Sequence, residues 1–445
     1  MSAYNVILKY PPKIKYPNME LKMKKLFSFI SVAMLGMSLL ASCAESDNSA
    51  EIEEEEETTE FTVTYEDPDY YTRFKGKGIS INVYNWGDYI SAGADEGTID
   101  VNGEFEKLTG IKVNYTNFAT NEELYAKLKG GAASYDVIIP SDYMISKMIK
   151  EDMIQPINFD NIPNFKYIME NFRNQDYDPN NAYSVPYTWG TVGIMYDTTM
   201  IDIPKEDIDW DLLWNEDYAD QILMFDNPRD AFAIAEIMLG YSLNTENEEE
   251  MRNSAAKLLE QKKIVQAYVM DEVFDKMGAG DALIAPYYAG DALTIMEDND
   301  ALDFVIPKSG TNLFIDAMCI PKSAKQKEAA EMYINFLCEP DIAFANIDYI
   351  CYSTPHQAAF NMLDEEMQNS PITYPNPDFI RDKTSVFVNL SDEANQLMQD
   401  LWTEMKSAED ENVNRWIAPV FLVFCVILMA FVLIRRHIKK KKDIF

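Results

Sequence analysis

Aromatic and acidic side chains follow the end of a predicted strand early in the body of the sequence. Apolar residues alternate from Ile79 to Val83, which predicts a half-buried strand, and this strand leads into Tyr84-Asn85-Trp86-Gly87-Asp88-Tyr89. Ring faces and carboxylates both attract ammonium groups. The cluster therefore predicts a groove for a ligand that is cationic and partly apolar.

The same residue types follow three further predicted strands. Ligands of open α/β sheets bind beyond the carboxyl ends of the strands, so these positions are expected to face one site. Taken singly, such aromatics are more often core residues and such aspartates turn formers, and only their recurrence favours a shared binding site. The residues are Ser141, Asp142 and Tyr143 after the strand 137–140, Asp226, Asn227 and Asp230 after the strand 223–225, and Tyr287, Tyr288 and Asp291 after the strand 283–285.

Helices alternate with these strands from about residue 79 to residue 410. Three helix starts carry capping signals, in Thr120-Asn121-Glu122-Glu123, Thr245-Glu246-Asn247-Glu248 and Ser323-Ala324-Lys325-Gln326. Alternation of this kind favours an α/β fold with largely parallel sheets. Because about 330 residues are too many for a single core, two lobes are expected.

The chain is strongly acidic, with a net charge of −36 over 445 residues. Residues 1–42 carry six Lys and one Glu, and residues 435–445 carry six Lys or Arg and one Asp. The stretch between them therefore has 38 − 12 = 26 basic and 74 − 2 = 72 acidic residues, a net charge of −46. A body of this charge repels nucleic acid and anionic membrane surfaces and attracts cations, although acidity also serves solubility alone. No nucleic-acid partner is expected.

The N-terminal region has the organisation of a lipoprotein export signal. Met23-Lys24-Lys25 precedes an apolar run from Leu26 to Leu40, and Leu40-Ala41-Ser42-Cys43 resembles a bacterial lipobox. We therefore expect a signal peptide over residues 23–43 and lipidation of Cys43. Residues 1–22 are interpreted as an upstream extension or a misassigned start, and residues 44–75 as an acidic, disordered tether.

A second apolar segment lies near the C-terminus. Residues 416–434 contain no charged side chain, and residues 435–445 are rich in Lys and Arg. This pattern predicts a transmembrane helix with a basic cytoplasmic tail. The acidic body is then expected on the extracytoplasmic face of the cell membrane, the side on which a lipidated Cys43 also lies.

Residue types that several catalytic and metal sites need are scarce. Only His356 lies in the body, and the body's cysteines show no disulfide pattern. The chain also lacks a phosphate-binding loop. We therefore expect no enzymatic activity, no metal and no cofactor. The cysteines are Cys319, Cys338 and Cys351.

Spaced motifs across the body resemble the spermidine/putrescine-binding proteins of bacterial polyamine ABC importers. They occur in the family's order and cover the chain from about residue 79 to the low 400s. The motifs are Tyr84-Asn85-Trp86, Tyr125-Ala126-Lys127-Leu128, Tyr135-Asp136-Val137, Pro140-Ser141, Asp178-Pro179-Asn180-Asn181, Ser184-Val185-Pro186-Tyr187, Ile320-Pro321, Ile334-Asn335-Phe336-Leu337 and Tyr352-Ser353-Thr354-Pro355.

The resemblance implies a two-lobe periplasmic-binding-protein fold with two interlobe crossovers. Lobe 1 would comprise residues 79–189 and 316–360, and lobe 2 residues 190–315 and 361–410. Aromatic rings would sandwich the methylene chain of a polyamine, and carboxylates and hydroxyls would hold its ammonium groups. The ligand-facing residues so implied are Trp86, Gly87, Tyr89, Ser141, Tyr143, Asn227, Asp230, Tyr288, Phe314, Asp316 and Tyr352, with Asp316 and Asp230 as the principal amine contacts.

Several positions depart from the family's pattern. Asn227 replaces an Asp, Val386 falls near a Gln, and Gly87 replaces a small hydroxyl residue, while Tyr288 and Phe314 replace Trp. The lost carboxylate and amide remove partners for part of a triamine, which favours a shorter diamine such as putrescine. The candidates to compensate are Asp88, Asp142 and Asp291.

The implied role is capture rather than chemistry. Closure of the lobes would bury the ligand, and the closed form would dock on an ABC permease that is coupled to a separate ATPase. One alternative keeps the fold but binds another cation, thiamine or ferric iron. A second is an anchored hydrolase that uses paired carboxylates, Asp226 with Asp230 or Asp88 with Asp142.

Overall fold

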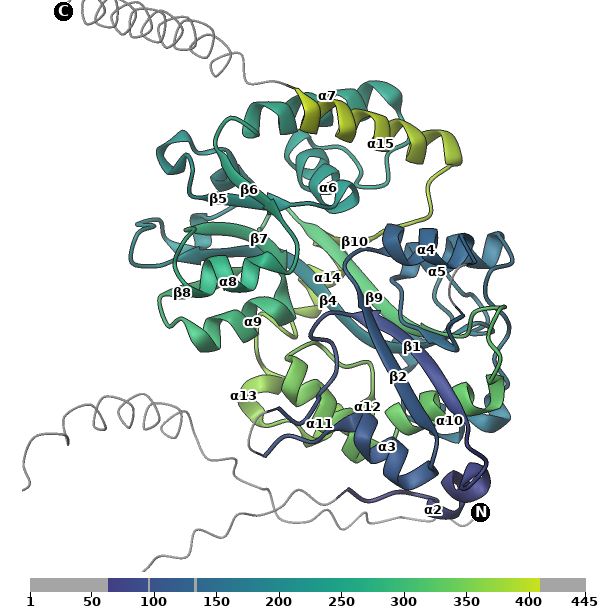
Figure 1. The fold of residues 1–445 in the computed structure, drawn as a ribbon. Coiled ribbons are helices and arrows are strands. Elements are labelled where there is room, and N and C mark those ends of the chain that lie inside the picture. The colour runs from purple at the N-terminus through teal and green to yellow at the C-terminus, as the bar shows by residue number, and fades with distance from the viewer. Residues whose placement is uncertain (1–62, 95–96, 132–133, 409–445) are drawn as a thin grey trace, which may run out of the picture. The chain divides into compact units, whose positions relative to one another are not determined.

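The computed structural model describes residues 63–94, 97–131 and 134–408. Within these ranges ten strands form one hydrogen-bonded sheet (Figure 1). The strands are β1 (Ser80–Trp86), β2 (Lys112–Phe118), β3 (Val137–Ile138), β4 (Ser184–Asp197), β5 (Ile222–Phe225), β6 (Val265–Val269), β7 (Ile284–Tyr288), β8 (Leu302–Val305), β9 (Thr311–Cys319) and β10 (Thr384–Val386).

The order along the sheet path is β2-β1-β3-β9-β4-β7-β5-β6, with β10 paired to β9 and β8 paired to β4. The flanking pairs are parallel, as in β1 with β2 and β5 with β6. The central pairs that involve β4 are antiparallel, with β7, β8 and β9. The expectation of largely parallel sheets therefore holds for the flanks and fails at the centre, because the long strand β4 runs against its neighbours.

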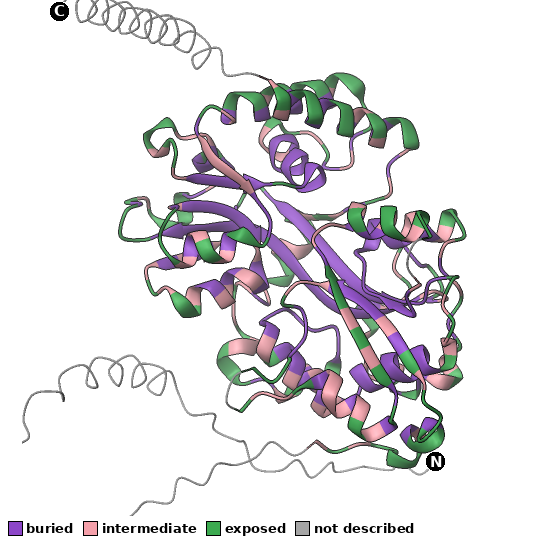
Figure 2. Ribbon diagram, in the orientation of Figure 1, coloured by how far each residue is buried: buried purple, intermediate pink, exposed green. Residues whose placement is uncertain are grey.

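Two hydrophobic cores lie along this path, which confirms the predicted two-lobe α/β fold. Val185 and Trp189 of β4 belong to the first core, whereas Val192 and Tyr196 of the same strand belong to the second. Figure 2 shows β4 and β9 buried throughout their length. These two adjacent strands connect the cores and supply the two expected crossovers.

Helices cover each core. The first core packs α2 (Pro68–Tyr71), α3 (Val101–Thr109), α4 (Asn121–Lys129), α5 (Asp142–Lys150), α10 (Lys327–Leu337), α11 (Pro340–Ile350) and α12 (Gln357–Met362). The second packs α6 (Pro228–Leu239), α7 (Glu248–Gln261), α8 (Glu272–Gly278), α9 (Ala289–Asp298) and α15 (Asp392–Ser407). Short helices α13 (Glu365–Gln368) and α14 (Pro377–Lys383) lie in the segment that leads to β10.

The predicted helix starts agree with the structure to different degrees. Thr120 caps α4, because its side chain accepts a hydrogen bond from the Glu123 amide. Helix α7 begins later than its signal and is capped by Asn247. The helix predicted from Ser323 begins only at Lys327, because a buried carboxylate, Asp136, takes the amides of residues 325 and 326.

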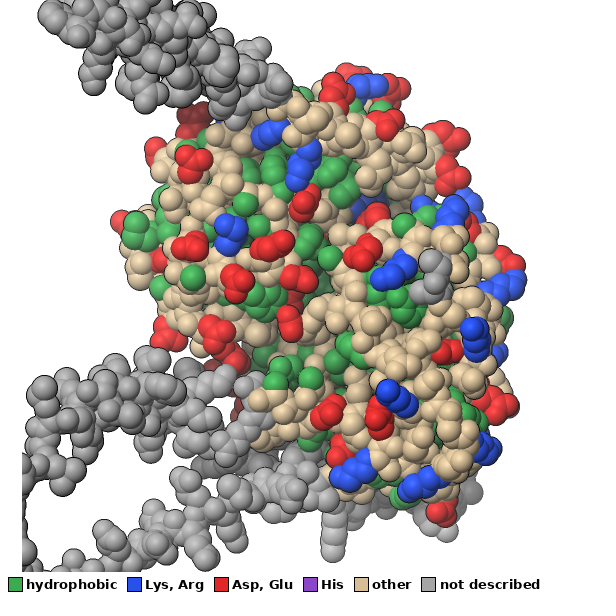
Figure 3. All heavy atoms as spheres, in the orientation of Figure 1, with side chains coloured by type: hydrophobic (Ala, Val, Ile, Leu, Met, Phe, Trp, Pro, Cys, Tyr) green, Lys and Arg blue, Asp and Glu red, His purple; other side chains and the backbone are tan. Residues whose placement is uncertain are grey.

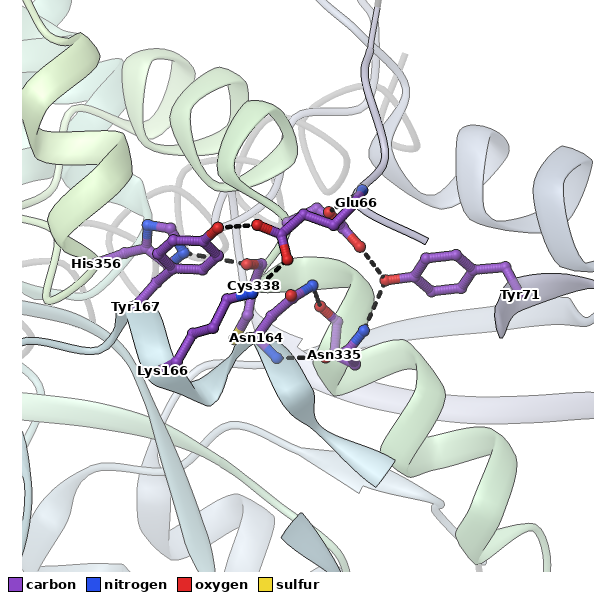
Figure 4. Close-up of polar contacts among 9 residues, drawn as sticks. Glu66, Tyr71, Asn164, Lys166, Tyr167, Asn335, Cys338 and His356 are labelled. Atoms are coloured by element: carbon purple, nitrogen blue, oxygen red, sulfur yellow. Dashed lines mark hydrogen bonds and ion pairs between the residues drawn. The ribbon is translucent and has the colours of Figure 1, made fainter. Parts of the chain in front are cut away.

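The residues before β1 are folded against the first core (Figure 4). Glu66 pairs with the Lys166 ammonium and also accepts a hydrogen bond from Tyr167. Further along, the Tyr71 hydroxyl donates to the Glu339 carboxylate over 2.6 Å. Residues 63–75 are therefore folded rather than part of the acidic tether predicted over residues 44–75, because their apolar side chains have a core to pack on.

One part of the fold prediction is wrong. The sequence predicts a transmembrane helix, but within residues 63–94, 97–131 and 134–408 no helix is both long and apolar enough to cross a bilayer. Positions 416–434 lie outside these ranges, as do residues 1–43 with the predicted signal and Cys43. The described residues form the two-lobe α/β body, and none of their helices spans a membrane.

Candidate ligand-binding site

A cavity lies where the two cores meet, and its lining comes from strand ends and loops of both. From the first core come residues after β1, before α4 and at the start of α5. From the second come residues after β5, β6 and β7, and β9 runs along the cavity between them. The lining residues are Trp86, Gly87, Tyr89, Ala119, Asn121, Ser141, Tyr143, Asn227, Asp230, Met270, Asp271, Tyr287, Tyr288, Asp291, Asn312, Phe314, Asp316, Tyr352 and Phe387.

Asp316 is the carboxylate that β9 presents to this cavity. Its Oδ2 accepts a hydrogen bond of 2.7 Å from the Tyr89 hydroxyl, and its Oδ1 is buried without a partner among the described residues. Burial raises the pKa of Asp316 to about 6, and the nearby polar side chains of Ser141 and Tyr89 oppose this rise. A carboxylate with one free oxygen in a buried cavity is suited to an ammonium group.

Asp230 forms a second acidic group, in the first turn of α6. Its Oδ2 accepts hydrogen bonds from the Asn227 amide over 2.7 Å and the Tyr288 hydroxyl over 2.8 Å. Burial raises the pKa of Asp230 to about 7, and the hydrogen bond from Tyr288 lowers it in part. Neither hydrogen-bond donor is charged, so neither neutralises the charge that this carboxylate carries when it is ionised.

Asp291 and Asp271 place two more carboxylates at the cavity. The pKa of Asp291 is raised to about 8, mainly by burial and also by the charges of Asp271, Asp88 and Asp316, against a hydrogen bond from Tyr352 that lowers it. Asp271 lies in the loop after β6 and is exposed as a whole residue, but its carboxyl is partly buried. This partial burial raises the pKa of Asp271, and the charge of Asp88 also raises it. Mutual repulsion of this kind is relieved by a bound cation.

Aromatic rings lie between the carboxylates. Tyr89 and Tyr352 meet edge to face with their centroids 4.7 Å apart, and Tyr288 and Phe314 do so at 5.5 Å. Phe314 also contacts Tyr352, at 6.2 Å. Phe314 thus contacts both the Tyr352 ring, which lies beside Asp291, and the Tyr288 ring, whose hydroxyl donates to Asp230. These faces and edges provide an apolar path between the acidic groups.

The lining contains no Lys, Arg or His side chain. Arg229, which directly precedes Asp230 in the sequence, lies behind the lining. Its guanidinium is 4.5 Å from the Phe387 ring and 5.8 Å from the Tyr143 ring. Burial lowers the pKa of this guanidinium, while nearby acidic groups raise it. The carboxylates that line the cavity are therefore left without a cationic partner in the lining itself.

All eleven ligand-facing residues that the resemblance implies line this cavity, and so does Asp291. Asp88 does not line it and adopts a left-handed φ of 45° in the turn after β1. Gly87 beside it lies across from the second core, where a Cβ would come within 3.0 Å of the Asp271 carboxylate. The predicted aromatic and acidic residues are thus brought together from both cores.

Two carboxylates named as compensating or catalytic groups lie outside the cavity. Asp142 accepts hydrogen bonds from the amides of Tyr143 and Ile315, and burial raises its pKa to about 8. Asp226 is exposed and pairs with the Lys406 ammonium at 2.8 Å. Neither proposed hydrolase pair, Asp226 with Asp230 or Asp88 with Asp142, is assembled in the cavity.

Sequence reasoning missed several lining residues. Asn121 exchanges hydrogen bonds with Ser141, and Asp271 follows β6, a strand that the motifs did not mark. Asn312 lies two residues before Phe314 and four before Asp316, so the alternation of side chains along a strand could have identified it. Met270 and Phe387 carry no such signal.

His356 and the body's cysteines are structural. The His356 Nδ1 accepts from the Ala359 amide, so Nε2 donates to the Cys338 carbonyl over 3.0 Å (Figure 4). Burial lowers the pKa of His356 to about 4, which keeps the ring neutral. Cys319, Cys338 and Cys351 are buried free thiols.

The chain is similar to several known proteins. The model of the family described as bacterial extracellular solute-binding protein matches residues 133–383. The spermidine/putrescine-binding periplasmic protein of Escherichia coli K12 is 34% identical over 325 residues, which cover 73% of this chain and 90% of that protein. The putrescine-binding periplasmic protein SpuD of Pseudomonas aeruginosa is 29% identical, with 74% and 92% covered.

A solved structure shows the same relation. The spermidine/putrescine ABC transporter substrate-binding protein of Streptococcus pneumoniae superposes with a TM-score of 0.63 at 35% identity, over 74% of this chain and 99% of that chain. Because the family model matches more than half of the chain and the identity to the Escherichia coli protein extends over nearly all of that protein, membership is shown. The chain belongs to the bacterial extracellular solute-binding protein family.

Proposed function

We propose that this protein is the extracytoplasmic substrate-binding component of a polyamine ABC importer. The observation that carries the proposal is the cavity between the cores, where Asp230, Asp291 and Asp316 converge with aromatic rings and no cationic side chain belongs to the lining. A polyamine is an apolar rod with ammonium groups at fixed intervals. Its charges match the carboxylates and its methylene groups match the rings.

The proposed action is capture. The ligand enters between the cores, which close on it and carry it to a permease whose transport is driven by a separate ATPase. Tyr89 and Asp316 would hold one amino group, and Asp230 with Tyr288 another. The ring of Phe314 lies between these two sites and would contact the methylene chain.

Export and lipidation are part of the same proposal. The basic and apolar run before Leu40-Ala41-Ser42-Cys43 supports a signal peptide over residues 23–43 and a lipid on Cys43. A lipid anchor would keep the binding domain near the permease and raise its effective concentration there. Metabolic labelling with a palmitate analogue, in the wild type and Cys43→Ala, tests this step, and equal labelling of both would contradict it.

The ligand class is tested by titration calorimetry of the purified protein. The panel is putrescine, spermidine, spermine, thiamine and ferric citrate. We expect saturable binding of at least one amine, with putrescine the first candidate because Asn227 removes a carboxylate that a triamine would use. Binding of thiamine or ferric citrate without any amine would contradict the polyamine assignment.

A further inference from the structure

Strand β9 presents three side chains to the cavity, of which the sequence analysis identified two. Asn312, Phe314 and Asp316 all line it. They alternate along the strand, so their side chains leave the same face. Asn312 is therefore placed by the same backbone that places the Asp316 carboxylate.

The amide of Asn312 is buried but incompletely bonded. The residue is 4% exposed, and its Oδ1 has no hydrogen-bond partner among the described residues. Buried polar atoms are nearly always hydrogen-bonded, because an unpaired acceptor has lost its water without replacement. An unpaired amide that lines a ligand cavity thus lacks a donor that a ligand can supply.

Asn312 lies at the end of the cavity away from Asp316. The two are four residues apart, which along a strand corresponds to about 13 Å. Asn312 pairs in register with Ser385 of β10, and Phe387, shortly after that strand, also lines the cavity. Helix α6, whose first turn carries Asp230, packs against β9.

We propose that Asn312 is a further ligand contact, whose amide oxygen accepts an N–H hydrogen bond from the amino group held at Asp230. This inference rests on the proposed polyamine-binding function. A neutral amide adds direction to the contact without adding charge, while Asp230 supplies the charge. The end of the cavity away from Asp316 would then hold an amino group by one carboxylate, Asp230, and one amide, Asn312.

The test is Asn312→Leu, which keeps the size of the side chain and removes both polar atoms. We expect the affinity for putrescine and spermidine to fall about tenfold or more, as for loss of one hydrogen bond to a charged group. The melting temperature of the ligand-free protein should not fall, because the Oδ1 atom has no partner to lose.

The matched control is Asn335→Leu, at a buried Asn outside the cavity. Its Nδ2 donates to the Tyr71 hydroxyl and its Oδ1 accepts from the Asn164 amide (Figure 4). This change should lower the melting temperature and leave amine affinity within about twofold, since it breaks satisfied bonds far from the ligand. The two variants thus separate a ligand contact from a structural amide.

A second variant, Asn312→Asp, is isosteric and adds a charge. It should raise amine affinity and steepen its dependence on salt. Unchanged affinity in Asn312→Leu, or an affinity of Asn312→Asp at or below that of the wild type, would overturn the inference while wild-type binding still supported the proposed function. Failure of the wild-type protein to bind any amine would instead contradict the proposed function.

Discussion

Asp316 shows most directly how a residue's surroundings decide what it can bind. Tyr89 holds one of its oxygens and leaves the other without a partner, in a cavity whose lining contains no cation. On an exposed turn the same carboxylate would have both oxygens solvated by water. At the scale of the residue, the site therefore consists of buried carboxylates that lack cationic partners in the lining.

Asp316→Asn is expected to weaken amine binding by about 2 to 5 kcal/mol, or roughly 30-fold or more, because a buried ammonium would lose its counter-charge. Asp298→Asn is the control, since Asp298 is exposed in the last turn of α9. Titration calorimetry measures both. A change within about twofold in Asp316→Asn would show that the amine does not contact this residue.

Amine binding is also expected to depend on pH. In the ligand-free cavity burial raises the pKa of Asp316 to about 6, of Asp230 to about 7 and of Asp291 to about 8. A bound ammonium favours the ionised carboxylates, so binding near neutral pH should release protons and affinity should rise from about pH 5 to about pH 9. Calorimetry in buffers of different ionisation enthalpy counts the released protons.

The stability of the ligand-free protein should change in the opposite direction. These carboxyl groups have a higher pKa in the folded state than the value of about 3.9 for an unfolded Asp, so the folded state binds more protons between about pH 4 and pH 8. Their contribution to stability is therefore lost as the pH rises through this window. An amine affinity that did not vary with pH would contradict the binding expectation, and a ligand-free stability that did not fall as the pH rises through this window would contradict the stability expectation.

Strand ends and helix starts assemble the site at the next scale. The predicted strands before Trp86, Ser141, Asp226 and Tyr287 appear as β1, β3, β5 and β7, because alternating or continuous apolar residues suit a buried sheet. The start of α4 follows from its own capping residue, Thr120. The start of α10 does not, because the distant Asp136 takes the amides that a local cap would have bonded.

Helix α9 makes a close contact between the two cores. A Cβ on Gly290 would lie 2.2 Å from the Tyr352 ring, which Tyr89 holds edge to face. Gly290→Ala should therefore oppose closure and reduce amine affinity by about 1 to 3 kcal/mol, or roughly 5- to 150-fold. Gly278→Ala in α8 is the control, since no atom lies within 4 Å of its Cβ position.

Calorimetry of both Gly variants, together with small-angle scattering with and without putrescine, checks this expectation. Gly290→Ala should need more ligand to reach the compact form. Equal affinity of Gly290→Ala and the wild type would show that this approach of α9 to Tyr352 is not needed for binding.

The charge of the whole molecule is the property that acts over the longest range. The chain carries a net charge of −36, and on the face shown in Figure 3 acidic side chains gather over α8 and α9. Asp271, which precedes α8, also lines the cavity. A field of this sign attracts cationic ligands toward the opening and is screened by salt.

The association rate of putrescine should therefore fall several-fold between about 10 mM and about 150 mM salt, and the dissociation rate should change less. Glu272→Gln with Asp275→Asn should reduce both the rate and its salt dependence. Asp400→Asn with Glu404→Gln on α15 serves as the control of equal charge change. Stopped-flow tryptophan fluorescence measures the rates, and rates independent of salt would contradict steering.

Local sequence by itself determined the residue types at the strand ends, the strands that deliver them and the capping of α4, because strand alternation and capping act over a few residues. Motif order determined the family. The tertiary structure decided the rest: that Asp142 bonds backbone amides while Asp316 keeps a free oxygen, that Asp226 pairs with Lys406 outside the cavity, and that Asn312 and Asp271 line it. Burial and partners depend on segments that lie far apart in the chain, so neither can be read from the residues around each position.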